Sequence, residues 1–151
     1  MLGLTGFREI LTRISRVFMP AILIAGCAPL PLTPEDLEAR KFEAVSGKAV
    51  IYLVRDSLDF SNDQAPIYIG ENLLLTTYPG TYYRWVVAAG RHTLKGYGQD
   101  SGTITVEAGQ GRIYFVQQRV THIRVTNSNF ALVSEQQGRA AVLRSVLLTV
   151  P

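Results

Sequence analysis

The part of the chain best suited to chemistry lies near its start, where a cysteine follows two small residues. The run Ile24-Ala25-Gly26-Cys27 has the pattern of a bacterial lipobox. In a lipobox, the cysteine sulfur receives a diacylglycerol, the chain is cut in front of the cysteine, and the freed amine usually receives a third acyl chain. The sequence therefore predicts covalent lipidation at Cys27.

A secretory signal peptide fits the residues before Cys27. The segment 1–16 is basic, and the apolar stretch 17–26 follows it. This order is that of a signal peptide. The alternative, a transmembrane helix, requires about 20 apolar residues, whereas this stretch is shorter and contains Pro20. We therefore expect residues 1–26 to be removed on export.

The cysteine count and the charge restrict what the exported domain can do. Cys27 is the only cysteine, so acylation leaves no thiol for a disulfide, and the domain must fold on its hydrophobic core alone. The chain has a formal net charge of +3, and the signal segment contributes +2 of it through Arg8, Arg13, Arg16 and Glu9. The remaining domain is nearly neutral, so its charge is no reason to expect nucleic acid or an acidic partner.

Catalytic and metal-binding patterns are the next candidates. His92 and His122 are the only histidines. They fall on different predicted strands or turns without clustered carboxylates, whereas a metal site requires more ligands, and we expect the His92 ring to hydrogen-bond the main chain. A G-x-S-x-G nucleophile signature does not occur. The glycines at 96, 98 and 102 precede a strand, whereas a phosphate loop precedes a helix. We therefore predict no catalytic residue, no metal and no cofactor.

Aromatic residues offer a last candidate, which is a binding face. In the predicted alternating strand 81–87, Tyr83 and Trp85 share the more apolar side and should face the core. Tyr82 and Arg84 would then lie outside, and we predict them as a contact surface. The alternative is that a wider set of aromatic residues lines a groove for a glycan, peptide or small molecule. We expect most residues of this set to lie in the core instead. This set comprises Tyr82, Tyr83, Trp85, Tyr97, Tyr114 and Phe115.

The elements that must position these residues begin with a tether and a short helix. Prolines between Ala28 and Pro34 restrict the backbone to extended conformations. Thr33 can cap a helix with Pro34 in its first turn, followed by acidic residues that the helix dipole favours. We predict that this helix ends near Gly47. Residues 27–46 would then hold the lipidated cysteine, the tether and the helix.

From Lys48 onward, short β-branched and aromatic runs alternate with turn residues, which is typical of strands. The first run has apolar residues on both faces, which favours a central strand. Two runs flank Gly70-Glu71 as a hairpin, and Pro79-Gly80 forms a further turn. The predicted strands are 48–55, 65–69, 72–77, 81–87, 91–97, 102–106 and 112–121.

The last part of the chain is predicted to contain edge strands and a helix. Residues 123–125 and 130–133 are expected to be edge strands around a loop at 126–129. Ser134, with Gln137 three residues later, can cap a helix from about Glu135 to Leu147. Its apolar face would be formed by Ala140, Val142, Leu143 and Val146, with Arg139 and Arg144 exposed.

These elements favour one mainly β domain over any α/β arrangement. Short strands with glycine and proline at the turns are typical of a β-sandwich, and no helical segment before the last is long enough to cross between parallel strands. We therefore predict a single antiparallel, immunoglobulin- or transthyretin-like β-sandwich at 47–151, with a short N-terminal helix and a C-terminal helix.

The order of several motifs resembles a known family of bacterial lipoproteins. The motifs are Gly47 to Arg55, Pro79 to Tyr83, Ala89 to Leu94, Gly109 to Val116, and Phe130 to Val133 with Glu135, Gly138 and Arg139. They make the chain similar to the family catalogued as domain of unknown function 2846. The turn at Ala89 also resembles those of surface-layer and transthyretin-like sandwich domains. The resemblance implies an envelope lipoprotein with a small sandwich domain, and it brings no established activity.

The sequence thus predicts a non-enzymatic, lipid-anchored envelope protein whose sandwich contacts a protein or the cell wall. Ala28 follows Cys27 at the position where an aspartate would retain a lipoprotein in the inner membrane. The periplasmic face of the outer membrane is therefore favoured in a host with two membranes. The expected partners are the membrane, through the lipid, and an envelope protein or cell-wall component, but no nucleic acid. A ligand-binding module is the alternative.

Overall fold

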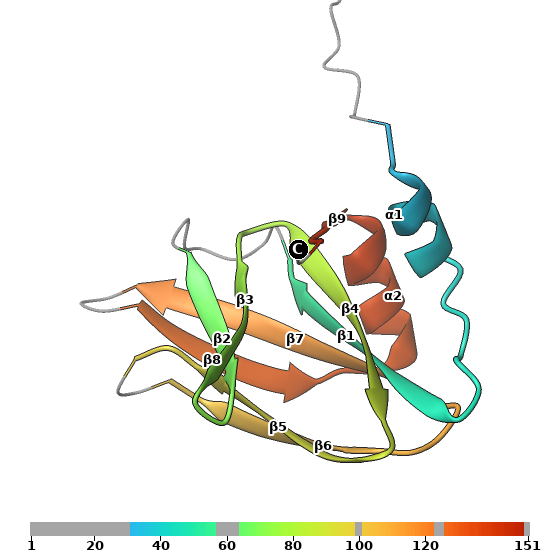
Figure 1. Ribbon diagram of the computed structural model, residues 1–151. Helices are drawn as coiled ribbons and strands as arrows, with labels where there is room; N and C mark the ends of the chain where they lie inside the picture. Colours follow the sequence, from blue (N-terminus) through green and yellow to red (C-terminus); the bar gives the residue numbers. More distant parts are fainter. Residues whose placement is uncertain (1–30, 57–63, 99–100, 123–125, 150–151) are drawn as a thin grey trace, which may run out of the picture. The chain divides into compact units, whose positions relative to one another are not determined.

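The computed structural model describes residues 31–149 apart from 57–63, 99–100 and 123–125 (Figure 1). Pro31–Pro151 form one compact unit. Cys27 and the rest of the predicted lipobox and signal peptide lie outside the described residues, as does the predicted edge strand at 123–125. None of the described helices is long and apolar enough to cross a membrane.

The described strands form two sheets that pack against each other (Figure 1). A five-stranded sheet has the order β8-β7-β1-β4-β9, and a four-stranded sheet has the order β3-β2-β5-β6. The predicted mainly β architecture with two sheets and two helices is confirmed. The strands are β1 (Lys48–Arg55), β2 (Ala65–Ile69), β3 (Asn72–Thr77), β4 (Thr81–Ala88), β5 (Gly90–Gly96), β6 (Thr103–Ala108), β7 (Ile113–His122), β8 (Thr126–Leu132) and β9 (Val146–Leu147).

The five-stranded sheet is mixed, so the prediction of a wholly antiparallel sandwich is wrong. β1 pairs in parallel with β7, where Val50 lies opposite Ile113, and β4 pairs in parallel with β9, where Thr81 lies opposite Val146. The four-stranded sheet is antiparallel throughout. Alternation of apolar and polar residues shows which face a side chain occupies, but it does not show the direction of a neighbouring strand that is distant in the chain.

β1 has buried side chains on both faces because a layer of structure covers each side of its sheet. Ile51 and Leu53 belong to the hydrophobic core between the two sheets. Tyr52 and Val54 belong to a second core, which lies between the five-stranded sheet and the helices (Figure 1). The predicted central position of β1 is thus confirmed, with β7 on one side and β4 on the other.

The predicted hairpin is confirmed, whereas one predicted loop is a strand. β2 and β3 flank Gly70 and Glu71, and Gly70 has a φ of +60°, which suits the turn. The segment 126–129 belongs to β8 instead of forming a loop. Its polar composition suggested a loop, but Ser128 is buried and its hydroxyl accepts a hydrogen bond of 2.9 Å from the Gln118 amide.

The helix α1 (Pro34–Ala39) begins as predicted and ends earlier. Its cap is Thr33, whose hydroxyl accepts a hydrogen bond of 3.2 Å from the Asp36 amide. The helix does not continue to Gly47, because Phe42 has a φ of +54°, which lies outside the right-handed helical region. Phe42 instead joins the core beneath the helices.

The helix α2 (Glu135–Leu143) also begins as predicted, with a complete capping box formed by Ser134 and Gln137. It ends before Leu147, because the chain turns at Arg144 and Val146–Leu147 form β9 beside β4. The buried residues of α2 are Gly138, Ala141 and Val142, whereas Leu143 and Val146, which were expected on the buried face, are exposed.

Candidate functional site

The two sheets meet along one side of the sandwich and part along the other. On the joined side, the Gly102 amide, directly before β6, donates a hydrogen bond of 2.6 Å to the Ser128 carbonyl in β8. On the other side, β3 ends one sheet and β9 ends the other. No hydrogen bond between described residues joins β3 to β4 or to β9. We call this parted side, between β3 and β4, the window.

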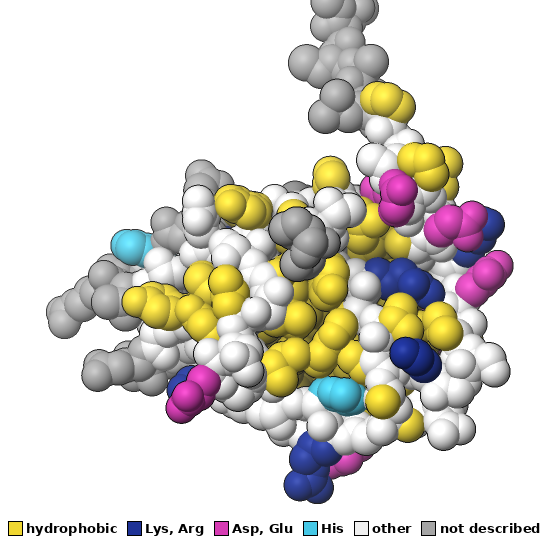
Figure 2. Space-filling model, in the orientation of Figure 1, with side chains coloured by type: hydrophobic (Ala, Val, Ile, Leu, Met, Phe, Trp, Pro, Cys, Tyr) yellow, Lys and Arg dark blue, Asp and Glu magenta, His cyan; other side chains and the backbone are white. Residues whose placement is uncertain are grey.

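Hydrophobic side chains fill the window without being fully covered. Leu74, Tyr83, Trp85 and Leu148 pack against the core between the sheets but are only partly buried. Figure 2 shows hydrophobic side chains in a band across this side of the molecule. A connected apolar surface that remains open to water is typical of a binding site.

The rim of the window includes an ordered histidine. The His92 ring contacts the Trp85 ring edge-on, with 5.2 Å between the centroids. Its Nε2 donates a hydrogen bond of 2.8 Å to the Ala88 carbonyl, so the ring binds the main chain as predicted. His122 is the last residue of β7, whereas His92 belongs to β5 in the other sheet. The structure therefore does not bring the two histidines together.

A hollow of about 460 Å³ adjoins the window, between α1, β4 and the segment after β9. Tyr83 and Leu148 line both the hollow and the window. Glu35 and Arg84 add charged groups to the hollow. Arg84 Nη2 lies 3.5 Å from the Glu43 carbonyl, while its buried Nε has no hydrogen-bond partner among the described residues. The hollow therefore offers both acidic and basic groups beside the apolar surface of the window.

The structure corrects the predicted contact surface, because Tyr82 is fully buried. Tyr83 and Trp85 face the core between the sheets, as predicted. The opposite face of β4, expected to be exposed, is covered by the helices, so Tyr82 belongs to the second core. Arg84 is partly buried and lines the hollow. Of the predicted pair, only Arg84 is accessible to a partner.

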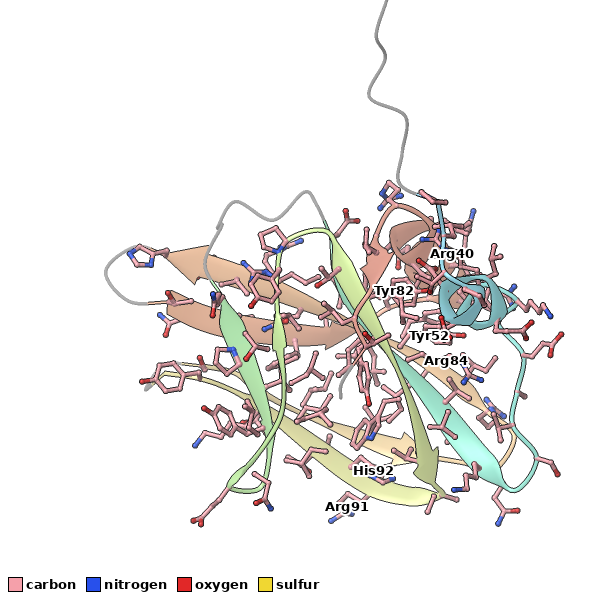
Figure 3. All side chains as sticks on the ribbon, turned by 45° about the horizontal axis from the view of Figure 1, so that its top comes forward. Arg40, Tyr52, Tyr82, Arg84, Arg91 and His92 are labelled. Carbon is pink, nitrogen blue, oxygen red and sulfur yellow. The ribbon has the colours of Figure 1, made fainter. Side chains whose placement is uncertain are left out.

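Tyr82 takes part in a buried polar cluster that fixes α1 to the sheet (Figure 3). Its hydroxyl donates a hydrogen bond of 2.7 Å to Asp36, which also forms an ion pair with Arg40. Arg40 in turn donates to the carbonyls of Leu143 and Ser145, at 3.0 and 2.7 Å. These contacts join α1 to β4 and to the end of α2. Because every charged group in the cluster has a partner, we assign it a structural role.

The cluster shifts the pKa values of its members. Burial alone would raise the pKa of Asp36, but the hydrogen bonds from Arg40 and Tyr82 outweigh burial and hold the pKa below its usual value. Burial, followed by the hydrogen bond to Asp36, raises the pKa of Tyr82 well above its usual value. The cluster is therefore stable with Asp36 ionised and Tyr82 protonated.

Acid is expected to destabilise the protein through Asp36. A carboxyl group whose pKa falls on folding adds stability above its unfolded-state pKa, about 3.8 here, and that stability disappears as the pH falls through the lower folded-state value. The melting temperature of the wild type should therefore drop below about pH 4. Asp36→Asn should be less stable at neutral pH and lose less in acid. If acid lowered the melting temperatures of both proteins equally, this role of Asp36 would be contradicted. Glu135→Gln, at an exposed position of α2, is the control.

The wider aromatic set is divided between core and surface. Tyr82 and Phe115 are buried, Tyr114 is partly buried, and Tyr97 is 61% exposed. Sequence reasoning missed Tyr68, which lies near Tyr97 with 6.5 Å between ring centroids. A hollow of about 290 Å³ beside the two rings is also lined by Glu71 and Lys95. We call this surface the tyrosine shelf. It forms because β2 pairs with β5, and neither segment alone shows that pairing.

A second polar network lies buried between the sheets. Gln118 accepts a hydrogen bond of 2.6 Å from the Thr77 hydroxyl and donates one of 2.9 Å to the Ser128 hydroxyl. The Thr77 carbonyl accepts from the fully buried Arg55, at 3.3 Å. These interactions satisfy the buried polar side chains, so the network explains how polar residues are accommodated in the core.

Within the described ranges, no group of three or more His, Cys, Asp or Glu side chains could hold a metal ion.

Comparison with known proteins gives no family for the chain. No model of a known protein family matches it, and a search of curated proteins finds no match either. The functional argument therefore rests on the residues and the geometry.

Proposed function

We propose that the protein is a lipid-anchored, non-catalytic component of the bacterial envelope that binds a partner protein or the cell wall through its β-sandwich. The window is the observation that carries this proposal. It combines partly exposed apolar side chains with an adjoining hollow that is lined by the charged side chains of Glu35 and Arg84. The lipobox at Cys27 and the resemblance to the family of domain of unknown function 2846 support the location, which we place at the periplasmic face of the outer membrane.

The anchor is tested by Cys27→Ser. This change removes the only thiol in the chain, and the lipid-transfer step requires a thiol. We expect the variant to incorporate no labelled fatty acid in growing cells and to keep its signal peptide, whereas the wild type incorporates label and is cleaved. Equal labelling of both proteins would show that the acyl chain, if any, is attached elsewhere.

Binding through the window is tested with a matched pair of arginine variants. Arg84→Ala changes the hollow beside the window, whereas Arg119→Ala changes an exposed arginine on β7. After crosslinking in intact cells, we expect recovery of the bound partner to fall in Arg84→Ala and to remain at the wild-type level in Arg119→Ala. Equal recovery in both variants would move the contact away from the hollow.

The second candidate function is binding of a glycan or small molecule on the tyrosine shelf. Two adjacent tyrosine rings beside Lys95 and Glu71 offer both stacking and polar contacts. A ligand at one hundred times its dissociation constant should stabilise the protein by about 2.7 kcal/mol. Cell-wall fragments that raise the melting temperature of the wild type, but not of Tyr97→Ala, would favour this alternative.

We also propose that the sandwich is of the immunoglobulin- or transthyretin-like type.

A further inference from the structure

The window has a hydrogen-bonding edge in addition to its apolar surface. The amides of Val146 and Leu148 donate to the carbonyls of Gly80 and Tyr82 in front of and within β4, at 2.9 and 2.7 Å. In a strand, the main-chain groups of alternate residues point to the same side. The main-chain groups of the next alternate residues in β4, Arg84 and Val86, therefore point to the same edge.

Among the residues that the structure describes, no strand neighbours that edge beyond Tyr82. β9 covers only Thr81 and Tyr82 of β4. Among the described residues, no hydrogen bond reaches the main chain of Arg84 or Val86 from the window side. β4 runs in regular register beside β1 along its whole length and contains no proline, so it lacks the bulges and prolines that usually protect an edge strand.

We propose that the window binds one extended segment of a partner protein as an added strand beside β4, in the line that β9 begins. This inference rests on the proposed function and specifies the partner as a polypeptide. Arg84 and Val86 each present one amide donor and one carbonyl acceptor, spaced two residues apart. An extended main chain matches this pattern of donors and acceptors. Glycans and lipid chains do not carry it, and they would leave these groups unpaired.

The surroundings of the edge define the side chains of the added strand. Its alternate side chains point to opposite faces. On one face they would contact the apolar band at Tyr83 and Trp85, which favours apolar residues. On the other face they would lie over the hollow, which is lined by the charged side chains of Arg84 and Glu35. The fitting segment therefore alternates apolar and polar residues and places an acceptor near Arg84.

A proline at position 86 tests the main-chain contact. Val86→Pro removes the amide that faces the window, while the ladder between β4 and β1 uses the other residues of β4 and is kept. Val86→Thr retains the amide and nearly the same side-chain shape, so it is the matched control. The readout is photocrosslinking in intact cells from a benzophenone amino acid at position 92, on the rim of the window, using the full-length lipidated protein.

We expect mass spectrometry to map the crosslink to one polypeptide segment, at the wild-type level in Val86→Thr and about tenfold lower in Val86→Pro. As a second measurement that does not depend on a variant, the mapped segment is synthesised and added to the wild-type protein. Amide exchange at Arg84 and Val86 should then slow by about tenfold or more, because added strand bonds protect these amides. The same peptide N-methylated at alternate amides should give no protection.

The outcomes separate this inference from the proposed function. A crosslinked protein that is unaffected by Val86→Pro, with no exchange protection at Arg84, would overturn strand addition and leave partner binding intact. Crosslinks to a glycan, a lipid or a second copy of this chain would also overturn it. Absence of any crosslink from the window would overturn both proposals. If Val86→Pro fails to fold, as judged by circular dichroism, the exchange measurement decides.

Discussion

Tyr82→Ala is expected to destabilise the protein by about 3 to 5 kcal/mol, the usual cost of truncating a fully buried aromatic side chain. Tyr82 has an exposure of 0% and packs 6.2 Å from the Tyr52 ring, measured between centroids. Its removal also leaves Asp36 without one of its hydrogen-bond donors. Because a domain of this size is stable by only about 5 to 15 kcal/mol, the midpoint of urea unfolding should fall sharply.

Two further variants show where this loss arises. Tyr82→Phe keeps the ring and removes only the donor to the Asp36 carboxylate, so about 1.5 to 3 kcal/mol should be lost. Arg84→Ala, two residues along the same face of β4, should cost less, because Arg84 is partly exposed and its contact to the Glu43 carbonyl is long, at 3.5 Å. If Arg84→Ala proved more destabilising than Tyr82→Ala, the helices could not cover this face of β4 at the position of Tyr82.

The alternation of residues in β4 was enough to predict which side chains share a face, but not how deeply each face is buried. Tyr83 and Trp85 do face the core between the sheets. The other face carries Tyr82 and Val86, which are also hydrophobic, and such a composition is the one local signal of a second covering layer. The covering layer comes from α1 and α2, whose position on the sheet depends on contacts between distant residues such as Tyr82 and Asp36. Such contacts leave no local periodicity in the sequence.

The candidate site was less predictable than the fold for a related reason. The lipobox is a local motif, so four adjacent residues are sufficient to propose an anchor at Cys27. The window, in contrast, exists because β3 and β4 are not paired and because β9 ends after Leu147. The segment that forms β9 was predicted as the end of a helix. Only strand pairing in three dimensions shows that Arg84 and Val86 lie at an open edge.

Gly138→Ala is expected to destabilise the protein even though alanine is the better helix former. Within an exposed helix, replacing glycine by alanine would gain about 1 kcal/mol. At this position the added Cβ would lie 2.1 Å from Phe115 Cγ and 2.3 Å from Phe115 Cβ. A Cβ atom is fixed by the backbone, so rotation of the Phe115 ring cannot remove the overlap. α2 must move away from β7, and overpacking of this kind costs about 1 to 3 kcal/mol, or more when the backbone has to shift.

The effect of Gly138→Ala can be assigned to this contact by a double-mutant cycle with Phe115→Leu. If the overlap with Phe115 causes the loss, the change at Gly138 should cost less in the Phe115→Leu variant than in the wild type, with a coupling energy of about 1 kcal/mol or more. Gln136→Ala, on the exposed side of α2, should change stability by no more than about 0.5 kcal/mol. A gain in stability from Gly138→Ala alone would mean that α2 does not press on β7. The close approach of α2 to the sheet depends on a residue without a side chain, because only then can the Phe115 ring fill the space beneath the helix beside Phe42 and Tyr52.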